Sequence, residues 1–213
     1  MQSKLNPAFA AGVRRVPGIP VLTIDDAAVA VPLAEALVAG GLSVLEITLR
    51  TPAALEALRQ IGVRVPGAMV GAGTVLTPDH ADAAIAAGAR FLVSPGMTPR
   101  LLAAAERWAV PFLPGVATVS EAMALSDLGY RMLKFFPAEQ VGGAAVLKAI
   151  GAPIKELLFC PTGGIDAARA PEYLRLANVA CVGGSWVAPA KAVAGGDWRT
   201  ITALAREARA LRP

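Results

Sequence analysis

One lysine of the sequence stands where lysine is rarely found. Lys134 interrupts the apolar run Met132–Pro137, whereas the other four lysines lie in segments of helical or linking character. A lysine is almost never buried without a partner or a purpose. Burial disfavours the charged form of an amine, and a neutral amine beside a carbonyl group can form a Schiff base. The alternative is a structural lysine paired with a buried carboxylate, and this residue alone does not decide between the two.

A second apolar run carries charged side chains that Lys134 could meet. The segment Leu45–Arg50 reads LEITLR. Successive side chains of a strand point to opposite faces, so Glu46, Thr48 and Arg50 share one face. Inside a common site, Glu46 would be a general acid/base, and Arg50 would grip a carboxylate with two parallel hydrogen bonds. An ion pair that merely fills the interior is the alternative interpretation.

Two glycine pairs follow later apolar runs. They lie in Pro161–Asp166 (PTGGID) and in Gly183–Ser185 (GGS). Glycine lets backbone N–H groups approach an anion closely, and Ser185 adds a hydroxyl, so these stretches together predict a phosphate site. Two other runs end in residues that could line the same site. Thr74 supplies a hydroxyl after Gly-Ala-Gly, and Pro95 shapes the segment Ser-Pro-Gly.

These residues belong to a regular alternation of short apolar runs and Ala/Leu-rich amphipathic segments. The centres of successive runs are 20 to 26 residues apart, the length of one strand, one helix and two short loops. Eight such units predict an α/β fold, a (β/α)8 TIM barrel, because parallel strands buried on both faces alternate with the helices that cover them. The apolar runs are Gly18–Ile24, Leu42–Leu49, Ala68–Val75, Phe91–Pro95, Pro111–Val116, Met132–Pro137, Leu157–Thr162 and Ala180–Ser185.

A barrel of this kind would bring the candidate residues together at the carboxyl ends of its strands. A doubly wound open sheet is the alternative, but it usually has about five or six strands and often a GxGxxG turn, which this sequence lacks. We expect an additional N-terminal helix around Ser3–Gly12, a last helix over Trp198–Leu211, and a single barrel domain spanning residues 1–213.

Helix boundaries are indicated by capping residues and glycines. Helix starts are predicted at Thr51-Pro52, Thr77-Pro78, Thr98-Pro99, Ser120-Glu121 and Asp166. Helix ends are predicted at Gly40, Gly62, Gly88, Gly129 and Gly151.

Composition excludes several classes of protein. With 55% hydrophobic and 17% charged residues the chain is not disordered. The mean hydropathy of +0.54 owes most to alanine, and no charge-free stretch reaches the roughly 18 apolar residues of a membrane helix. The net charge of +4 is scattered without a basic stripe, so we expect neither a nucleic acid nor a membrane as partner, and a cytoplasmic protein.

The sequence contains few residues that could ligate a metal or activate a nucleophile through histidine. Its single histidine, His80, nearly excludes a His-based metal site and makes a Ser–His–Asp or Cys–His arrangement improbable. Cys160 and Cys181 stand inside apolar runs, which favours buried thiols over a disulfide framework. We expect no metal in the site.

Taken in order, the motifs closely resemble those of the 2-keto-3-deoxy-6-phosphogluconate (KDPG) aldolase family, the bacterial class I aldolases of the Entner–Doudoroff pathway. The resemblance runs from Pro20 to about Arg206 and includes Gly183–Trp186. Each motif alone is weak, whereas the ordered set is specific. The motifs are Glu46-x-x-x-Arg50, Gly71–Thr74, Ser94–Gly96, Lys134–Glu139 and Phe159–Ile165.

The resemblance implies a role for each candidate residue. Lys134 would be the Schiff-base lysine and Glu46 the general acid/base. The residues that would surround the pyruvate half of the substrate are Arg50, Thr74, Pro95 and Phe136. Those that would hold its far half are Thr162, on a sugar hydroxyl, and Gly163, Gly164, Gly184 and Ser185, on the phosphate.

The same resemblance implies an activity and a partner. The substrate would be a small phosphorylated keto-acid, 2-dehydro-3-deoxy-6-phosphogluconate, cleaved to pyruvate and glyceraldehyde 3-phosphate without a metal or an organic cofactor, because the iminium on the lysine is the electron sink. Activity on 4-hydroxy-2-oxoglutarate and assembly as a homotrimer are also implied.

Rival functions stay open at this point. The 6-phosphogalactonate epimer could be the substrate, and Thr162 gives only a slight reason to prefer the gluconate series. A phosphate-binding barrel epimerase or decarboxylase usually needs an Asp-x-Lys pair on one strand, but residue 132 is Met. A non-catalytic binding barrel is the remaining alternative. Covalent trapping of pyruvate by borohydride would separate all of these.

Overall fold

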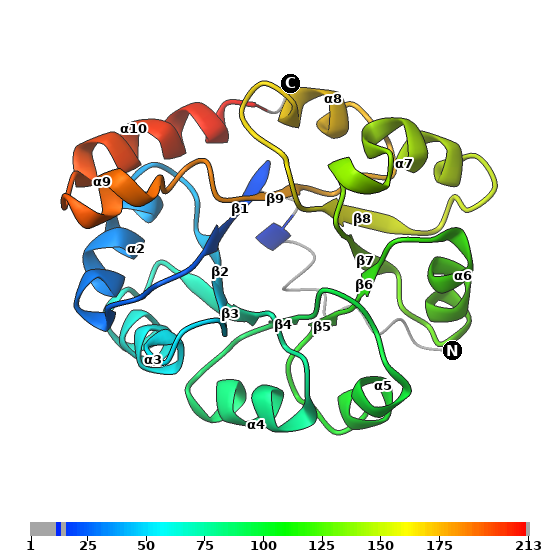
Figure 1. Cartoon of the computed structure of the whole chain (residues 1–213), viewed down its shortest axis with the longest axis horizontal. Coiled ribbons are helices and arrows are strands. Elements are labelled where there is room, and N and C mark those ends of the chain that lie inside the picture. The colour runs from blue at the N-terminus through cyan, green and yellow to red at the C-terminus, as the bar shows by residue number, and fades with distance from the viewer. Residues whose placement is uncertain (1–11, 14–15, 212–213) are drawn as a thin grey trace.

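The computed structural model describes residues 12–13 and 16–211. These residues form a ring of strands surrounded by helices (Figure 1), as the predicted α/β barrel requires. The N-terminal helix predicted around Ser3–Gly12 lies outside the described residues except for Gly12. The single-domain organisation of residues 1–213 stays a prediction.

Nine short strands make up the wall of the barrel in the described part of the chain. All of their pairings are parallel, in a six-stranded sheet of order β5-β4-β3-β2-β1-β9 and a three-stranded sheet of order β6-β7-β8. The strands are β1 (Gly18–Leu22), β2 (Val44–Thr48), β3 (Met69–Gly73), β4 (Leu92–Val93), β5 (Phe112–Leu113), β6 (Gly115–Val116), β7 (Met132–Phe135), β8 (Leu158–Pro161) and β9 (Val182–Gly184).

The nine strands occupy the eight predicted positions because the fifth predicted run is divided. Pro114 separates β5 from β6; it has no N–H to donate, while its carbonyl accepts a hydrogen bond from the backbone N–H of Lys134 at 2.9 Å. Two isolated bridges, Phe159↔Val179 and Thr162↔Gly183, join β8 to β9. The two sheets thus meet at both edges, and the ring closes.

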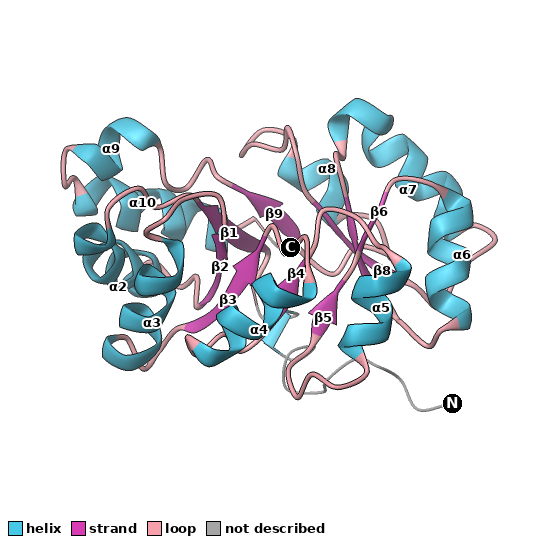
Figure 2. Cartoon of the chain, turned by 60° about the horizontal axis from the view of Figure 1, so that its bottom comes forward, coloured by secondary structure: helices cyan, strands magenta, loops and turns pink. Residues whose placement is uncertain are grey.

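Helices cover the outside of this ring (Figure 2). Short 3-10 turns, η1 (Ala27–Val29) and η2 (Glu139–Val141), precede two of them. In the part of the chain that the structure describes, no helix is long and apolar enough to cross a membrane. The helices are α2 (Ala30–Ala39), α3 (Ala54–Arg64), α4 (Pro78–Ala86), α5 (Pro99–Ala105), α6 (Val119–Asp127), α7 (Gly143–Gly151), α8 (Ala170–Leu174), α9 (Ala190–Ala194) and α10 (Trp198–Arg209).

The predicted helix starts are partly correct. Thr77 and Thr98 cap α4 and α5, each followed by proline. The prediction at Thr51 is wrong, because its hydroxyl donates to the carbonyl of Ile24 at 2.5 Å and α3 begins only at Ala54. Asp166 accepts from the amides of residues 168 and 169, so it caps a turn that precedes α8 rather than the helix itself.

The predicted helix ends are also partly correct. Gly88 and Gly129 follow their helices with φ of 99° and 89°, as C′ glycines do. Gly62 lies inside α3, and Gly151 is the last residue of α7. At the end of α2 the left-handed position belongs to Gly41, with φ of 93°, rather than to Gly40. The predicted last helix is confirmed as α10.

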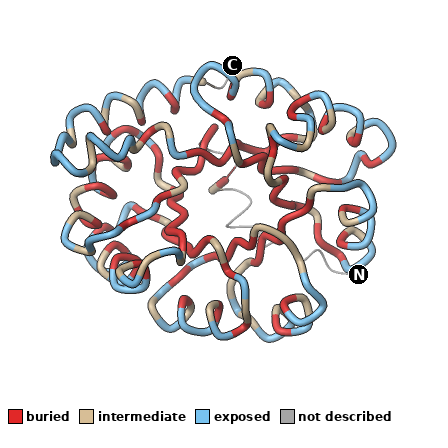
Figure 3. The backbone as a smooth tube through the Cα atoms, in the orientation of Figure 1, coloured by how far each residue is buried: buried red, intermediate tan, exposed pale blue. Residues whose placement is uncertain are grey.

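The hydrophobic core follows the strand ring (Figure 3). Outward-facing strand residues pack beneath the helices; Phe135 and Phe159, on neighbouring strands, meet edge to face with ring centroids 6.4 Å apart. Three charged or polar residues of β2 and β7 are buried in the same wall: Glu46, Thr48 and Lys134. A polar set inside an apolar wall is what positions the candidate site.

A capping box fixes the turn between β6 and α6. Thr118 accepts from the amide of Glu121, while the Glu121 carboxylate accepts from the amides of Thr118 and Ala117. The predicted start at Ser120-Glu121 is therefore displaced by two residues: the cap is Thr118, and Ser120 lies inside the helix. The hydrogen bond from Ala117 is the main reason that the pKa of Glu121 is lowered.

We expect Thr118→Ala to lower the free energy of unfolding by about 1 kcal/mol, as urea unfolding would measure.

The contribution of Glu121 to the free energy of unfolding should depend on pH. Because its folded-state pKa lies below the unfolded value of about 4.3, its charge stabilises the fold above that pH, and this is lost as the pH falls through the folded-state pKa. Urea unfolding of wild type and Glu121→Gln should therefore differ near neutral pH and converge in acid. Glu207→Gln, at an exposed position of α10, is the control; a difference that persists in acid would contradict the assignment.

Candidate active site

The centre of the candidate site is an ion pair inside the barrel wall. The Nζ atom of Lys134 on β7 lies 3.2 Å from Oε1 of Glu46 on β2, and the two side chains are only 6% and 5% exposed. The strand parity therefore placed both groups in one site, as the sequence predicts. A carboxylate at this distance can accept a proton from the ammonium group and leave the amine that attacks a carbonyl.

A glycine on the next strand makes room for the carboxylate. Gly73 ends β3, opposite Thr48 of β2. A Cβ added at Gly73 would stand 2.1 Å from Oε1 of Glu46 and 2.6 Å from its Cγ. No side chain fits there while Glu46 keeps its position. No role for this glycine was predicted from the sequence, although a glycine inside a strand is a recognised sign of close approach.

Arg50 and Thr74 meet at the rim of the barrel. They follow β2 and β3, and Nε of Arg50 lies 3.2 Å from Oγ1 of Thr74. Thr74 adopts φ of 58°, an uncommon conformation for a residue with a branched side chain. Arg50 is exposed, so its guanidinium is accessible at the mouth. The predicted carboxylate-binding arginine and its neighbouring hydroxyl are thus brought together at the carboxyl ends of β2 and β3.

Phe136, Pro95 and Thr162 occupy three further strand ends. The ring centroid of Phe136 lies 5.4 Å from Nζ of Lys134, within range of a cation–π contact. Pro95 follows β4, and its carbonyl oxygen lies 2.2 Å from the point that a Cβ on Gly115 would occupy. Thr162 is buried after β8, and a Cβ on Gly183 would stand 2.2 Å from its Oγ1.

The first glycine pair forms a turn with exposed backbone donors. Gly163 and Gly164 adopt φ of 106° and 76°, both in the left-handed region that favours glycine. In the described residues, the amides of Gly164 and Ser185 donate no backbone hydrogen bond outside the strand ladders, whereas the amide of Gly163 adjoins the bridge between Thr162 and Gly183. Unused N–H groups at the ends of neighbouring strands can bind an anion.

The second glycine pair ends a strand. Gly183 and Gly184 lie in β9, and Ser185 follows it as an exposed residue. A turn closed by the amide of Ala188 on the Ser185 carbonyl at 3.0 Å comes next, and α9 begins only at Ala190. The donors available here are therefore those of a turn. A Cβ on Gly184 would also meet the Trp186 ring at 1.9 Å.

Two groups of residues beside the site were not predicted to belong to it. The Glu139 carboxylate, at the end of the Lys134–Glu139 motif, accepts from the hydroxyl of Tyr173 and lies 3.4 Å from Nε of Arg169. Cys160 is the register partner of Lys134, and its sulfur lies 3.4 Å from that of Cys181. Both cysteines are buried and reduced, as predicted. These residues lie far apart in the sequence and come together only in the folded chain, so no local motif relates them to the site.

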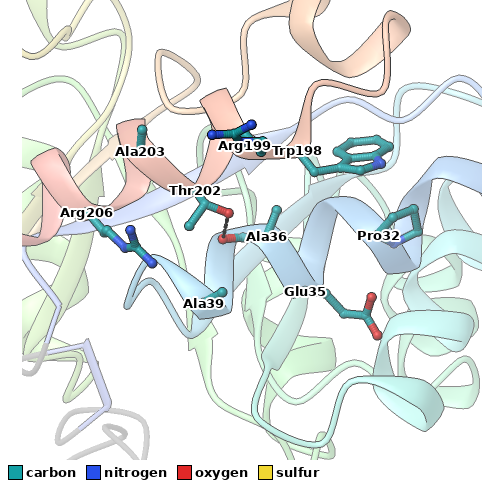
Figure 4. A pocket seen from close by; sticks show the side chains of 9 residues that line it. All are labelled: Pro32, Glu35, Ala36, Ala39, Trp198, Arg199, Thr202, Ala203 and Arg206. Atoms are coloured by element: carbon teal, nitrogen blue, oxygen red, sulfur yellow. Dashed lines mark hydrogen bonds between the residues drawn. The ribbon is translucent and has the colours of Figure 1, made fainter.

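A cleft on the outside of the barrel does not coincide with this site. It lies between α2 and α10, has a volume of about 660 Å³, and is crossed by a hydrogen bond of 3.1 Å from Thr202 to the carbonyl of Ala36 (Figure 4). None of the predicted site residues lines it. Among the described residues, no group of three His, Cys, Asp or Glu side chains could hold a metal ion.

Comparison with known proteins agrees with the geometry. The family model of KDPG and KHG aldolase matches residues 10–204. The chain is 51% identical over 192 residues to the KHG/KDPG aldolase of Escherichia coli (strain K12), an alignment that covers 90% of each protein.

Two solved structures are also similar. A KDPG aldolase from Legionella pneumophila, with pyruvate captured as a covalent carbinolamine intermediate, superposes with a TM-score of 0.93 at 47% identity and covers 97% of this chain and 100% of that one. The 2-keto-3-deoxy-6-phosphogluconate aldolase of Zymomonas mobilis ZM4, with 3-phosphoglycerate, gives a TM-score of 0.89 at 50% identity over 95% of each chain. With a family model over most of its length and relatives at about half identity, the chain belongs to the KDPG and KHG aldolase family.

Proposed function

We propose that this chain cleaves 2-dehydro-3-deoxy-6-phosphogluconate to pyruvate and glyceraldehyde 3-phosphate by way of a Schiff base on Lys134. The observation that carries the proposal is the buried ion pair of Lys134 and Glu46 at 3.2 Å. A lysine held in the wall of a barrel beside an acid/base is suited to attack a ketone. The carbinolamine captured in the Legionella pneumophila relative is the intermediate that such an attack forms first.

The first half of the reaction makes the electron sink. Glu46 accepts a proton from the Lys134 ammonium, and the amine adds to the C2 ketone of the substrate to give a carbinolamine. Glu46 returns that proton to the departing hydroxyl group, so that water leaves and an iminium ion forms. The Glu46 carboxylate, directly or through water, then takes the C4 hydroxyl proton, and the C3–C4 bond breaks; its electron pair moves into the iminium, and glyceraldehyde 3-phosphate leaves.

The second half returns the enzyme to its starting state. The enamine of pyruvate takes a proton at C3, for which Glu46, directly or through water, is the donor. Water then hydrolyses the iminium and frees pyruvate, so the water lost in the first half is regained. Arg50, beside Thr74 at 3.2 Å, pairs with the substrate carboxylate. Phe136 and Pro95 line the reacting centre at the ends of their strands.

The phosphate is held at the other side of the mouth. The amides of Gly164 and Ser185 donate no backbone hydrogen bond outside the strand ladders of the described residues, and Gly163, Gly164 and Ser185 follow neighbouring strands. We place the 6-phosphate on them and on Gly184, and a sugar hydroxyl on Thr162. Remote binding energy of this kind is used for orientation at the reacting carbon.

Several wider properties are proposed on the same basis. Activity on 4-hydroxy-2-oxoglutarate is supported by the double name of the Escherichia coli relative. The homotrimer and the cytoplasmic location stay predictions, and light scattering on the purified protein tests the first. The preferred configuration at C4 is tested by comparing the gluconate-derived and galactonate-derived substrates.

Replacing Lys134 with methionine should abolish adduct formation, because Lys134 is the one lysine that lies in a strand among the described residues. After incubation with pyruvate and borohydride, mass spectrometry should find one reduced adduct per chain in wild type and none in Lys134→Met. Lys148→Met, on the exposed face of α7, is the matched control and should trap normally. Trapping by the Lys134 variant would show that the nucleophile lies elsewhere.

Glu46→Gln should slow proton exchange at the methyl group of pyruvate by about 10²–10⁴-fold, the usual contribution of a general acid/base. The substitution keeps the shape of the side chain, so pyruvate binding should weaken far less. Solvent deuterium incorporation, followed by NMR, measures the exchange. A near wild-type rate would reduce Glu46 to a structural partner of Lys134.

Gly163→Ala should impair the phosphorylated substrate selectively. The new Cβ would lie 3.3 Å from the backbone of residues 137 and 138, and φ of 106° strains any side chain. Gly88→Ala is the matched control, because Gly88 has φ of 99° but open space around it and lies far along the chain from the phosphate residues. We expect kcat/KM for cleavage to fall by tenfold or more, about the value of one lost hydrogen bond to a charged group, with pyruvate exchange retained. Equal losses in cleavage and in pyruvate exchange would contradict the placement of the phosphate on this glycine turn.

A further inference from the structure

The glycine turn that we place under the phosphate needs to be held from outside. Two consecutive glycines with φ of 106° and 76° have no side chains to fix their conformation, and glycine has the most backbone freedom to lose. Their carbonyls are tied to other segments. The Gly163 carbonyl accepts from the amide of Glu139 at 3.1 Å, and the Gly164 carbonyl accepts from Nη1 of Arg169 at 3.0 Å.

The same two partners are joined to each other through the Glu139 carboxylate. Its Oε2 lies 3.4 Å from Nε of Arg169, and its Oε1 accepts from the hydroxyl of Tyr173. A Cβ on Gly164 would stand 2.8 Å from the Cβ and Cγ of Glu139, so the glycine packs directly on this side chain. One carboxylate thus connects the ends of β7 and β8 with helix α8.

Tyr173 is the buried anchor of this arrangement. It is fully buried in α8, whereas the side chain of Arg169 is 54% exposed. Burial, and then its hydrogen bond to Glu139, raise the pKa of Tyr173, so the hydroxyl stays a donor. A carboxylate beside a phosphate would repel it, but here the positive charge of Arg169 offsets the negative charge of Glu139, and the Tyr173 hydroxyl donates to its other oxygen.

We propose that Glu139, Tyr173 and Arg169 form a clamp that positions Gly163-Gly164 for the phosphate and so sets the preference for phosphorylated over unphosphorylated substrates. The inference rests on the proposed function. All three are positioning residues, because they act through the glycine turn rather than on the reacting atoms. Opening the clamp should weaken phosphate binding and leave the chemistry on pyruvate intact.

The first test removes one oxygen atom. Tyr173→Phe should lower kcat/KM for the phosphorylated substrate about tenfold, mainly through KM, because Glu139 loses a charge-assisted hydrogen bond. Deuterium exchange into pyruvate, which carries no phosphate, should stay within about twofold of wild type. Tyr130→Phe is the matched control: it removes the hydroxyl of the only other tyrosine, which is also buried but precedes β7, and it should change neither reaction.

Two further variants distinguish a clamp from general support of the fold. Glu139→Gln still accepts from Tyr173 and should retain more activity on the phosphorylated substrate than Glu139→Ala. In the pair Glu139→Ala/Tyr173→Phe the losses should be less than additive, because either change already breaks the same link. If Tyr173→Phe does not fold, Arg169→Met takes its place, since the Arg169 side chain is half exposed.

The outcomes separate this inference from the proposal beneath it. A wild-type protein that neither traps nor exchanges pyruvate would refute the proposed function. A wild-type protein active on both, with variants that lose both reactions equally or lose nothing on the phosphorylated substrate, would refute the clamp alone. A selective loss on the phosphorylated substrate, with recovery in Glu139→Gln, supports it.

Discussion

The structure depends on keeping a lysine and a glutamate together inside an apolar wall. Two charges removed from water carry a large desolvation cost, which their mutual attraction offsets only when the geometry is good. Here Nζ and Oε1 are 3.2 Å apart in side chains that are almost fully buried. The pairing also couples function to folding. Truncation of one partner leaves the other buried and uncompensated, so conservative replacements report on chemistry better than deletions do.

The two halves of the site are built by different means. The proposed pyruvate end consists of side chains on the strands β2 and β7 and on the residues after β2 and β3. The proposed phosphate end consists of backbone amides in turns after β8 and β9. The chemistry of a side chain is determined by the residue type, whereas the conformation of a glycine turn is fixed by the residues that contact it. The supports of the phosphate end therefore lie on α8 and η2, away from the glycines themselves.

Strand parity and periodicity were enough to predict the barrel and the meeting of Glu46 with Lys134, because both depend on local alternation. The features that could not be predicted depend on tertiary contacts. Thr51 resembles a helix cap in sequence, yet its hydroxyl donates a hydrogen bond to the carbonyl of Ile24 in the preceding barrel unit. Pro114 divides one predicted strand because a residue without an N–H interrupts the ladder. The link from Glu139 to Tyr173 spans 34 residues of sequence, and no local pattern marks it.

Two glycines without room for a Cβ atom restrict how this barrel can change over evolutionary time. Gly73 and Gly183 stand where any Cβ would overlap an oxygen of Glu46 or of Thr162. A side chain at either position would require that oxygen to move, although neither glycine touches the substrate in our scheme. Ser185, exposed at the rim, has no such restriction. A library that diversifies the mouth of this barrel can vary rim positions outside the proposed substrate contacts one at a time, while a change at either glycine of the inner wall needs a second substitution beside it.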